Sequence, residues 1–355
     1  MDWRLIAMPV APVNGDFDVT RLAQHLQSRL PVGPGELRAT PIAGGASNPT
    51  FILDWPEAGE GPRYVLRKKP PGVLLPSAHQ IEREYRIMTA LADTAVPVPA
   101  TRFIDETSEV VGTPFYVMDF VDGRIFRDAR LPGLDPNDRR EIYGSFVEIM
   151  AALHSVDPDK AGLGDLGRRE DFFGRQLSRW TQQYRSAETE SLDAMERLIT
   201  LLEGRLPKEG AARIVHGDLR IENIMVHPER PQGLALLDWE LCTLGDPLAD
   251  LGYACVGYHS DQPWFGRLGR LDLASQGLPS EADLVDHYCR LTGRSAVGDW
   301  GFYVAFALFR LAAIAQGVFK RGQQGNGAAH VAAQVNVAPD FARAALEALE
   351  LRQPK

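Results

Sequence analysis

The chain is poor in cysteine and has no excess of positive charge. Its three cysteines, Cys242, Cys255 and Cys289, lack the paired spacing that zinc sites and disulfide frameworks show. A reducing cytoplasm is therefore the compartment that we expect. The formal net charge of -9 over 355 residues argues against binding of nucleic acid through a generally basic surface.

Long apolar runs are also scarce. We expect no secretory signal peptide at the N-terminus, because Asp2 and Pro9 interrupt any apolar core there. The strongly apolar stretch at residues 302–309 lies in an expected helix over residues 299–320. Arg310 within that helix favours a buried core helix over a membrane span, so no membrane association is expected.

What the chain does contain is a dense polar segment. Residues 216–223 read His-Gly-Asp-Leu-Arg-Ile-Glu-Asn. Residues 224–226 and 234–237 have strand character, and two prolines and a glycine punctuate the connection between them. In an antiparallel pair the start of the first strand lies beside the end of the second. We therefore expect Asn223 and Asp238 to converge and to bind Mg²⁺, which prefers oxygen ligands.

Asp218 lies five residues before Asn223, on a loop entered from an apolar run. This spacing matches the kinase pattern of a catalytic Asp, four intervening residues and a metal-binding Asn. A surface loop with a hydrogen-bonded Asp is the simpler alternative. The segment resembles the signature of the aminoglycoside phosphotransferase family, kinase-like enzymes of small molecules that carry His-Gly-Asp where protein kinases carry His-Arg-Asp. The resemblance implies that Asp218 is catalytic and that Asn223 and Asp238 hold the metal.

The same resemblance implies an α+β, bilobal protein-kinase-like fold. The expected division is a small β-rich nucleotide-binding lobe over residues 1–118, a hinge over residues 119–123 and a larger, mainly helical catalytic and substrate-binding lobe over residues 124–355. Asp135 as N-cap and Pro136 at the first helical position open one expected helix. Further helical patterns occupy residues 171–187, 192–204, 281–292, 299–320 and 339–351.

A glycine-bearing turn upstream is a candidate phosphate-binding loop. It precedes the apolar run at residues 51–53, as expected for a turn between two strands that lies over phosphates. The full Gly-x-Gly-x-x-Gly pattern is absent, so a plain hairpin turn is an equal interpretation. Its candidate nucleotide-binding residues are Gly44, Gly45, Ser47 and Asn48.

A strand with a basic end follows at residues 64–69, and alternation places Arg67 and Lys69 on one face. By position Arg67 matches the kinase lysine that contacts the α- and β-phosphates, and arginine can form a bidentate phosphate clamp. Lys69 is the competing candidate, and a solvated strand end is the alternative to both. Glu84 shares the apolar face of an expected helix and needs a partner there. Pairing with Arg67 or Lys69 would give the strand-to-helix ion pair of kinases.

Residues 115–123 form an apolar strand that runs into Asp-Gly and resembles the hinge between kinase lobes. Met118, Asp119 and Phe120 would contact adenine. An ordinary strand ending in a turn has the same pattern, so this assignment depends on order along the chain. The order is glycine turn, basic strand, Glu helix, hinge, catalytic loop and metal Asp, as in kinases.

The phosphate acceptor is less determined. Glu240, Asp246 and Asp250 are candidates for a pocket that takes a cationic aminoglycoside or a choline-like amino alcohol, with a structural role as the alternative for Asp250. Arg175 and Arg179 are candidates for binding an anionic acceptor, with a solvated face as the alternative. In the resembling family an Asp at the place of Asp250 braces the catalytic loop.

A closer resemblance, from about residue 42 to residue 319, is to the kinase-like domain that some acyl-CoA dehydrogenases carry as an N-terminal fusion. It rests on residues 66–72, 75–79, 83–85 and 112–118. In those proteins the domain is implicated in phosphorylating hydroxylated acyl-CoA or related hydroxy acids. The resemblance implies a small-molecule kinase that uses ATP, or GTP, with Mg²⁺.

Two other classes stay open. A nucleotide-binding pseudokinase scaffold is opposed by the joint presence of Asp218, Asn223 and Asp238. A protein kinase is disfavoured by Gly217 in place of Arg and by Trp-Glu at residues 239–240 in place of Phe-Gly. The expected partner is therefore a small-molecule substrate.

Overall fold

The computed structural model describes residues 17–42, 48–59, 61–72, 80–208, 210–324 and 335–351. The described chain divides into two compact units. The first, which we call the N-terminal unit, comprises residues 17–122 together with Leu237–Glu240. The second, which we call the C-terminal unit, comprises Gly123–Leu236 and the chain from Leu241 onward.

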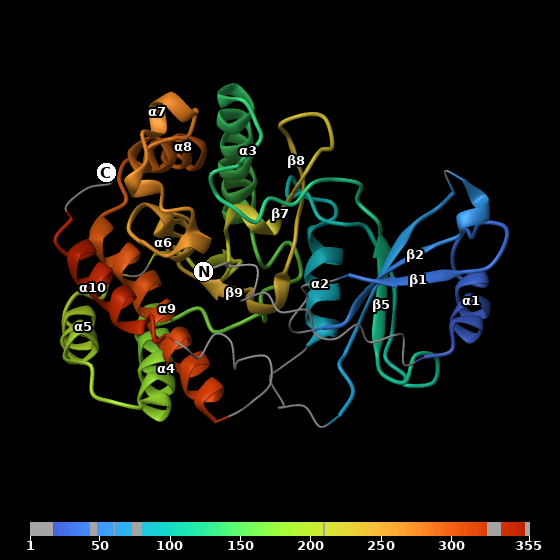
Figure 1. Ribbon diagram of the computed structural model, residues 1–355, viewed down its shortest axis with the longest axis horizontal. Helices are drawn as coiled ribbons and strands as arrows, with labels where there is room; N and C mark the ends of the chain where they lie inside the picture. Colours follow the sequence, from blue (N-terminus) through green and yellow to red (C-terminus); the bar gives the residue numbers. More distant parts are fainter. Residues whose placement is uncertain are drawn as a thin grey trace. The chain divides into compact units, whose positions relative to one another are not determined.

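The N-terminal unit is built on a five-stranded antiparallel sheet with strand order β1-β2-β3-β5-β4 (Figure 1). Its strands are β1 (Arg38–Pro41), β2 (Thr50–Asp54), β3 (Tyr64–Lys68), β4 (Thr101–Asp105) and β5 (Phe115–Asp119). Its helices are α1 (Val19–Gln27) and α2 (Ile81–Leu91).

Strand alternation gives the two faces of this sheet different roles. Leu66 and Val117 point toward the apolar core that also contains Leu22 of α1. Arg67 and Tyr116 are one residue away on the same two strands, so they point to the opposite face, where both contact Glu84 of α2. One face thus buries apolar side chains under α1, and the other presents polar groups to α2.

The C-terminal unit is mainly helical, with two short strand pairs, β6 with β9 and β7 with β8. The strands are β6 (Arg213–Val215), β7 (Ile224–Val226), β8 (Gly233–Leu236) and β9 (Thr243–Gly245). The helices are α3 (Pro136–Ser155), α4 (Phe172–Ala187), α5 (Asp193–Glu203), α6 (Leu248–Ala254), α7 (Leu273–Gln276), α8 (Glu281–Thr292), α9 (Trp300–Gln323) and α10 (Ala338–Ala348).

Helix α9 organises this unit, because it packs against α4, α6 and α10 (Figure 1). By length and composition α9 is apolar enough to cross a membrane, but 67% of its most apolar 18-residue window is buried inside the protein. Phe302, Phe306 and Phe309 are among its buried residues. Burial of this kind is what we expected for a core helix.

The predicted α+β class is confirmed, with a β-rich N-terminal sheet and a helical C-terminal part. The predicted start of α3 is confirmed as well, because the Asp135 side chain accepts hydrogen bonds from the N–H groups of Asn137 and Asp138. Helix α8 has the predicted bounds, and α10 ends at Ala348, three residues earlier than predicted. Helices α1, α6 and α7 were not predicted.

Candidate active site

The segment from His216 to Asn223 is a loop that joins β6 to β7 and ends in a short 3-10 turn, Ile221–Asn223. Asn223 closes the loop onto Asp218. Its Nδ2 donates to the Asp218 carbonyl oxygen at 2.7 Å and to Asp218 Oδ2 at 3.0 Å. Because the amide nitrogen is used in this way, the amide oxygen Oδ1 is the atom of Asn223 that remains suited to a cation.

The predicted hairpin after this loop is confirmed. Ile224, which follows Asn223, pairs with Leu236 in the antiparallel β7–β8 ladder, and Leu236 lies two residues before Asp238. Asp238 has a φ of 68°. Left-handed backbone is uncommon for residues other than glycine and clusters at functional sites, although Asp tolerates it better than most.

Gly217 is required by the backbone of the loop. Its φ is +84°, and a Cβ at this position would lie 2.7 Å from the carbonyl oxygen of Leu241. Asp250, near the start of α6, holds the two successive peptide units before Gly217, because it accepts from the N–H of His216 at 2.7 Å and from the N–H of Gly217 at 2.9 Å. Asp250 therefore braces the loop, as the resemblance implied.

The buried Asp250 carboxylate is stabilised in its charged form. Burial alone would raise the pKa of Asp250, but the hydrogen bond and electrostatic attraction of His154 hold it below the ordinary value. His216 and the N–H of Gly217 contribute in the same direction. His154 is itself fixed, since its Nε2 lies 3.1 Å from Asp250 Oδ2 and its Nδ1 lies 2.8 Å from the Tyr288 hydroxyl.

Charged and phenolic groups surround Asp218. Nε of Arg220 lies 3.6 Å from Asp218 Oδ2. Burial raises the pKa of Tyr253, and the nearby Asp218 carboxylate raises it further, so the Tyr253 phenol is protonated at neutral pH. Burial also raises the pKa of Glu222 to about 7, while Arg220 opposes that rise and Asp218 adds to it.

In the N-terminal unit a second polar cluster forms around Glu84. Arg67 Nε lies 2.9 Å from Glu84 Oε2, Asn48 Nδ2 donates to Oε1 at 2.9 Å, and the Tyr116 hydroxyl donates to Oε2 at 3.1 Å. Lys69 pairs instead with Glu82. Of the two basic residues that the sequence left open, Arg67 is thus the partner of Glu84.

The Arg67–Glu84 pair is nearly buried and has further acidic neighbours. Burial raises the pKa of Glu84, and Arg67 opposes that rise. For Arg67 burial alone would lower the pKa, but Glu84 reverses the direction, with contributions from Asp238 and Glu240. Arg67 Nη2 lies 3.7 Å from Asp238 Oδ1, so the guanidinium is shared between two carboxylates.

Of the four residues predicted for the phosphate-binding turn, the structure describes only Asn48. Gly44, Gly45 and Ser47 lie outside the described residues. Asn48 is fully buried on Glu84 rather than exposed on a turn.

At the predicted hinge, Met118 is in β5, paired with Val65 of β3. The N–H groups of Asp119 and Phe120 donate to the carbonyl oxygens of Ala100 and Arg63. The Asp119 carboxylate is also taken, since both of its oxygens accept from the Arg102 guanidinium at 2.6 Å. Any backbone contact of these two residues with a base is therefore left to their carbonyl oxygens.

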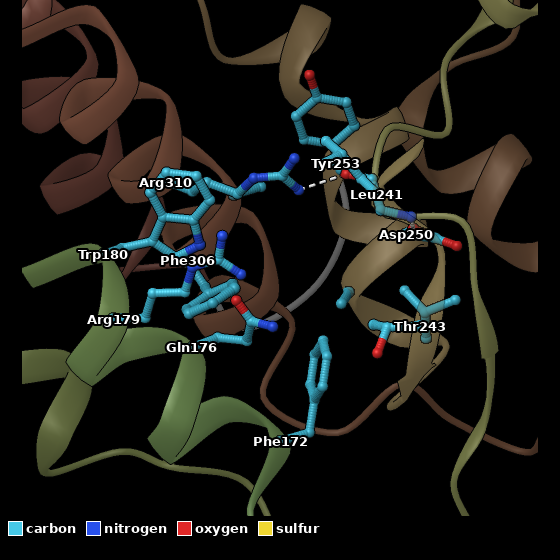
Figure 2. Close-up of a pocket in the computed structure, with 14 residues that line it drawn as sticks. Phe172, Gln176, Arg179, Trp180, Leu241, Thr243, Asp250, Tyr253, Phe306 and Arg310 are labelled. Carbon is cyan, nitrogen blue, oxygen red and sulfur yellow. Dashed lines mark hydrogen bonds between the residues drawn. The ribbon is translucent and has the colours of Figure 1, made fainter. Parts of the chain in front are cut away.

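A cavity opens beside the loop of residues 216–223, within the C-terminal unit. It contains about 580 Å³ of space not filled by protein atoms, and this figure includes space open to solvent. Figure 2 shows Gln176 and Arg179 projecting from α4 on one side, with Thr243 and Asp250 on the other. Its lining residues are Phe172, Gln176, Arg179, Trp180, Val215, Gly217, Leu241, Thr243, Ala249, Asp250, Tyr253, Phe306, Ala307 and Arg310.

The lining is aromatic and cationic. Arg179 and Arg310 contribute its basic groups, and Asp250 is the one acidic residue in the described lining. Among the predicted acceptor-binding residues, Arg179 lines this cavity. Arg175 is not part of the lining, and its Nη2 donates to the carbonyl oxygen of Arg168.

Of the three predicted acidic candidates, Asp250 lines the cavity and the other two lie elsewhere. Asp246 Oδ1 accepts from the N–H of Leu248 at the start of α6. Glu240 is exposed and belongs to the N-terminal unit. Neither residue is part of the described lining of this cavity.

Sequence reasoning assigned no role in the site to Trp180, Tyr253 or Arg310. Their helices are separated along the chain, and only the packing of α4, α6 and α9 brings them together. One signal was available, since a charged residue inside a strongly apolar helix requires a specific partner. Arg310 is such a residue.

The sequence matches the phosphotransferase enzyme family (APH) over residues 38–284. Acyl-CoA dehydrogenase family member 10 of Mus musculus is 44% identical over 292 residues, which is 82% of this chain and 27% of that protein. The chain thus spans about a quarter of the length of this relative.

Two solved structures share the fold. A structure from Ralstonia eutropha JMP134, provisionally assigned as an aminoglycoside phosphotransferase, is 41% identical with a TM-score of 0.83, covering 94% of this chain and 98% of that one. Spectinomycin phosphotransferase APH(9)-Ia in complex with ADP and spectinomycin has a TM-score of 0.62 at 13% identity, covering 94% and 99%. The latter likeness concerns the fold alone.

Proposed function

The chain belongs to the phosphotransferase enzyme family, and from that premise we propose that it transfers the γ-phosphoryl group of ATP to a hydroxyl group of a small molecule. The spectinomycin phosphotransferase of the same fold binds ADP together with its substrate, which supports a nucleotide donor here. GTP is the alternative donor.

The observation that carries the proposal is the double hydrogen bond from Asn223 to Asp218. It fixes a carboxylate that can accept a hydrogen bond from the acceptor hydroxyl and orient that oxygen for in-line attack. In phosphoryl transfer the protein contributes mainly positioning and charge stabilisation. A rigid Asp218 is therefore the central requirement, and Gly217 and Asp250 support it from the backbone side.

Magnesium fits the donor set that we assign to it. Asn223 Oδ1 and the Asp238 carboxylate are both oxygen donors, and Mg²⁺ usually combines one or two such protein ligands with substrate phosphates. When bound, the ion neutralises charge on the transferring group. Arg67, held by Glu84 and shared with Asp238, is the residue that we assign to the nucleotide phosphates.

For the acceptor we propose a hydroxy acid or hydroxyacyl compound that carries a negative charge. Arg179 and Arg310 supply positive charge to the cavity beside Asp218. Aromatic side chains, Phe172, Trp180 and Phe306 among them, provide contact area for an apolar portion of the acceptor.

A cationic aminoglycoside or amino alcohol is the weaker candidate. It would need uncommitted carboxylates, and both oxygens of Asp250 already accept backbone hydrogen bonds. The other two acids predicted for that role, Glu240 and Asp246, are not part of the described lining.

The test is a Mg-ATP consumption screen over hydroxyacyl-CoAs, hydroxy acids, amino alcohols and aminoglycosides, with mass spectrometry of the phosphorylated product. Hydroxy acids should be compared with amino alcohols of equal chain length, so that charge is the only major difference. We expect turnover with the anionic set. Faster turnover of the amino alcohols would overturn the acceptor assignment.

Asp218→Asn is the control for the chemistry. It removes the carboxylate while keeping the shape, so turnover should fall at least about a hundredfold, and stabilisation of the protein by Mg-ATP in a thermal shift assay should persist. Retained turnover would disprove the role of Asp218. Nucleotide stabilisation of the wild type without turnover of any acceptor would favour a pseudokinase scaffold.

A further inference from the structure

Arg310 is an unusual residue for its surroundings. It lies in the most apolar helix of the protein, α9, among largely buried neighbours. In the described part of the chain no carboxylate lies within ion-pair distance of its guanidinium, and its buried Nε has no hydrogen-bond partner there. Arg310 is partly buried, and desolvating a cation that has no counter-ion costs free energy. The placement of Arg310 therefore points to a role other than stabilising the helix.

The hydrogen bond that Arg310 makes identifies that role. Its Nη1 donates to the carbonyl oxygen of Gly217, 93 residues away in the chain. This carbonyl belongs to the peptide bond that joins Gly217 to Asp218. The neighbouring N–H of Gly217 donates to Asp250 Oδ1 at 2.9 Å. An anion and a cation thus hold Gly217 through its N–H and its carbonyl.

Two aromatic rings hold the guanidinium in place. Its central carbon lies 5.4 Å from the ring centroid of Trp180 and 5.2 Å from that of Tyr253. Cation–π contacts of this length are attractive when partly desolvated. Figure 2 shows Arg310 extending past Trp180 toward Tyr253, with the dashed line marking its hydrogen bond. Both rings also line the cavity beside Asp218.

We propose that Arg310 is a positioning residue for phosphoryl transfer, which fixes the Gly217–Asp218 peptide so that the Asp218 carboxylate meets the acceptor hydroxyl. The inference rests on the proposed function of Asp218. Arg310 itself touches no reacting atom in this mechanism. It acts through the peptide carbonyl, and Trp180 and Tyr253 link it to the wall of the acceptor cavity.

The first measurement is independent of turnover. Amide hydrogen exchange of residues 214–223 is followed in the wild type, Arg310→Ala, Arg310→Lys and Arg321→Gln. Arg321 is an exposed arginine of the same helix and serves as the matched control. Loss of one charged hydrogen bond should speed exchange in this segment roughly tenfold in Arg310→Ala. Arg310→Lys should show a smaller increase, and Arg321→Gln none.

The second measurement separates positioning from nucleotide binding. For the Mg-ATP reaction with the accepted substrate, kcat of Arg310→Ala should fall roughly ten- to a hundredfold, while KM for ATP stays within about twofold. Millimolar methylguanidinium should restore part of kcat in Arg310→Ala, and methylammonium should restore less. If Arg310 were needed only for folding, its substitution would not lower kcat while leaving KM for ATP unchanged, and methylguanidinium would not restore kcat.

The outcomes distinguish this inference from the proposed function. If the wild type turns over none of the acceptors, the proposed function fails, and hydrogen exchange still decides whether Arg310 fixes the loop. Unchanged exchange at residues 214–223 in a folded Arg310→Ala protein would overturn the inference, whatever the turnover. Unchanged kcat in that variant would overturn it as well.

Discussion

Arg67 Nη2 lies 3.7 Å from Asp238 Oδ1 while its Nε is 2.9 Å from Glu84. One guanidinium therefore links the strand-to-helix ion pair to the acid that we assign to the metal. Asp238 reaches this position with a left-handed backbone. The arrangement concentrates one positive and two negative groups in the N-terminal unit, where a nucleotide phosphate would compete for Arg67.

The Glu84 cluster can be tested with a pair of variants on one helix. Glu84 is 3% exposed and has three partners, Arg67, Asn48 and Tyr116. Glu84→Gln leaves the Arg67 charge without its main counter-ion, so we expect a loss of about 3 kcal/mol in unfolding free energy. KM for ATP should rise in the same variant. Urea unfolding and nucleotide titration measure the two effects.

Glu82→Gln is the matched control for Glu84→Gln. Glu82 lies two residues away on α2, and its pair with Lys69 is partly exposed. Exposed pairs contribute about 0 to 1 kcal/mol, so this variant should resemble the wild type in both assays. Equal losses of unfolding free energy in the two variants would show that the buried Glu84 pair contributes no more to stability than the exposed Glu82 pair.

The parts of the site that the sequence predicted are those linked by short-range geometry. Asp218 and Asn223 are five residues apart and share a hydrogen bond, and the predicted β7–β8 hairpin forms with Ile224 paired to Leu236. Local turn and strand patterns fix such relationships. The need of Glu84 for a cationic partner also followed from the pattern, because a carboxylate on an apolar helix face requires a cation nearby. The choice of Arg67 over Lys69 came from the structure.

The parts that the sequence did not predict depend on packing between distant helices. Arg310 meets Gly217 across 93 residues, and Trp180 and Tyr253 come from two further helices. Nothing in the periodicity of α4, α6 or α9 specifies which faces meet. Asp246 lies close to the motif in the sequence and was predicted to line the acceptor pocket. In the structure its carboxylate instead accepts a hydrogen bond from the N–H of Leu248 at the start of α6.

Gly217→Ala should impair both stability and turnover. Its φ of +84° is unfavourable for any side chain, and the new Cβ would lie 2.7 Å from the Leu241 carbonyl oxygen. We expect a loss of about 1 to 3 kcal/mol in unfolding free energy and a large loss of kcat, because Asp218 is the next residue. Denaturant unfolding and the ATP consumption assay measure these effects.

Gly144→Ala is the control for that substitution. Gly144 lies inside α3, and a Cβ there meets no atom within 4 Å. Alanine in a helix interior should therefore stabilise the protein by about 0.5 to 1 kcal/mol and leave turnover unchanged. If Gly217→Ala behaved like Gly144→Ala, the loop would not require its left-handed conformation.

Asp250 predicts a specific dependence of stability on pH. Its pKa in the folded protein is lowered, so its stabilising effect is fully present above the ordinary Asp pKa of about 3.9. The effect is lost as the pH falls through the lowered folded value. We expect Asp250→Asn to lose about 3 kcal/mol at pH 7 and the difference from wild type to shrink toward pH 3.

Urea unfolding of both proteins between pH 3 and pH 7 measures this difference. Asp261→Asn is the comparison, because Asp261 also has a lowered pKa but sits in an exposed pair with Arg270. Solvent screening should keep its effect under about 1 kcal/mol at every pH. A stability difference for Asp250→Asn that does not change with pH would contradict the assigned ionisation of Asp250.

Arg179 provides the sharpest test of the acceptor's charge. It lines the cavity and stacks on Trp180, with its guanidinium carbon 5.6 Å from the ring centroid. In contrast to Arg310, it has no hydrogen bond to the catalytic loop among the described contacts. Arg179→Gln should therefore raise KM for an anionic hydroxy acid about tenfold and leave kcat within a few-fold.

Arg185→Gln is the matched control, because Arg185 lies on the same helix, α4, in an exposed pair with Glu196. Salt supplies an independent readout. Raising ionic strength screens an exposed attraction, so KM for the anionic acceptor should rise in the wild type and in Arg185→Gln but much less in Arg179→Gln. An equal salt response in all three proteins would mean that Arg179 does not attract the acceptor, since screening cannot remove an interaction that is absent.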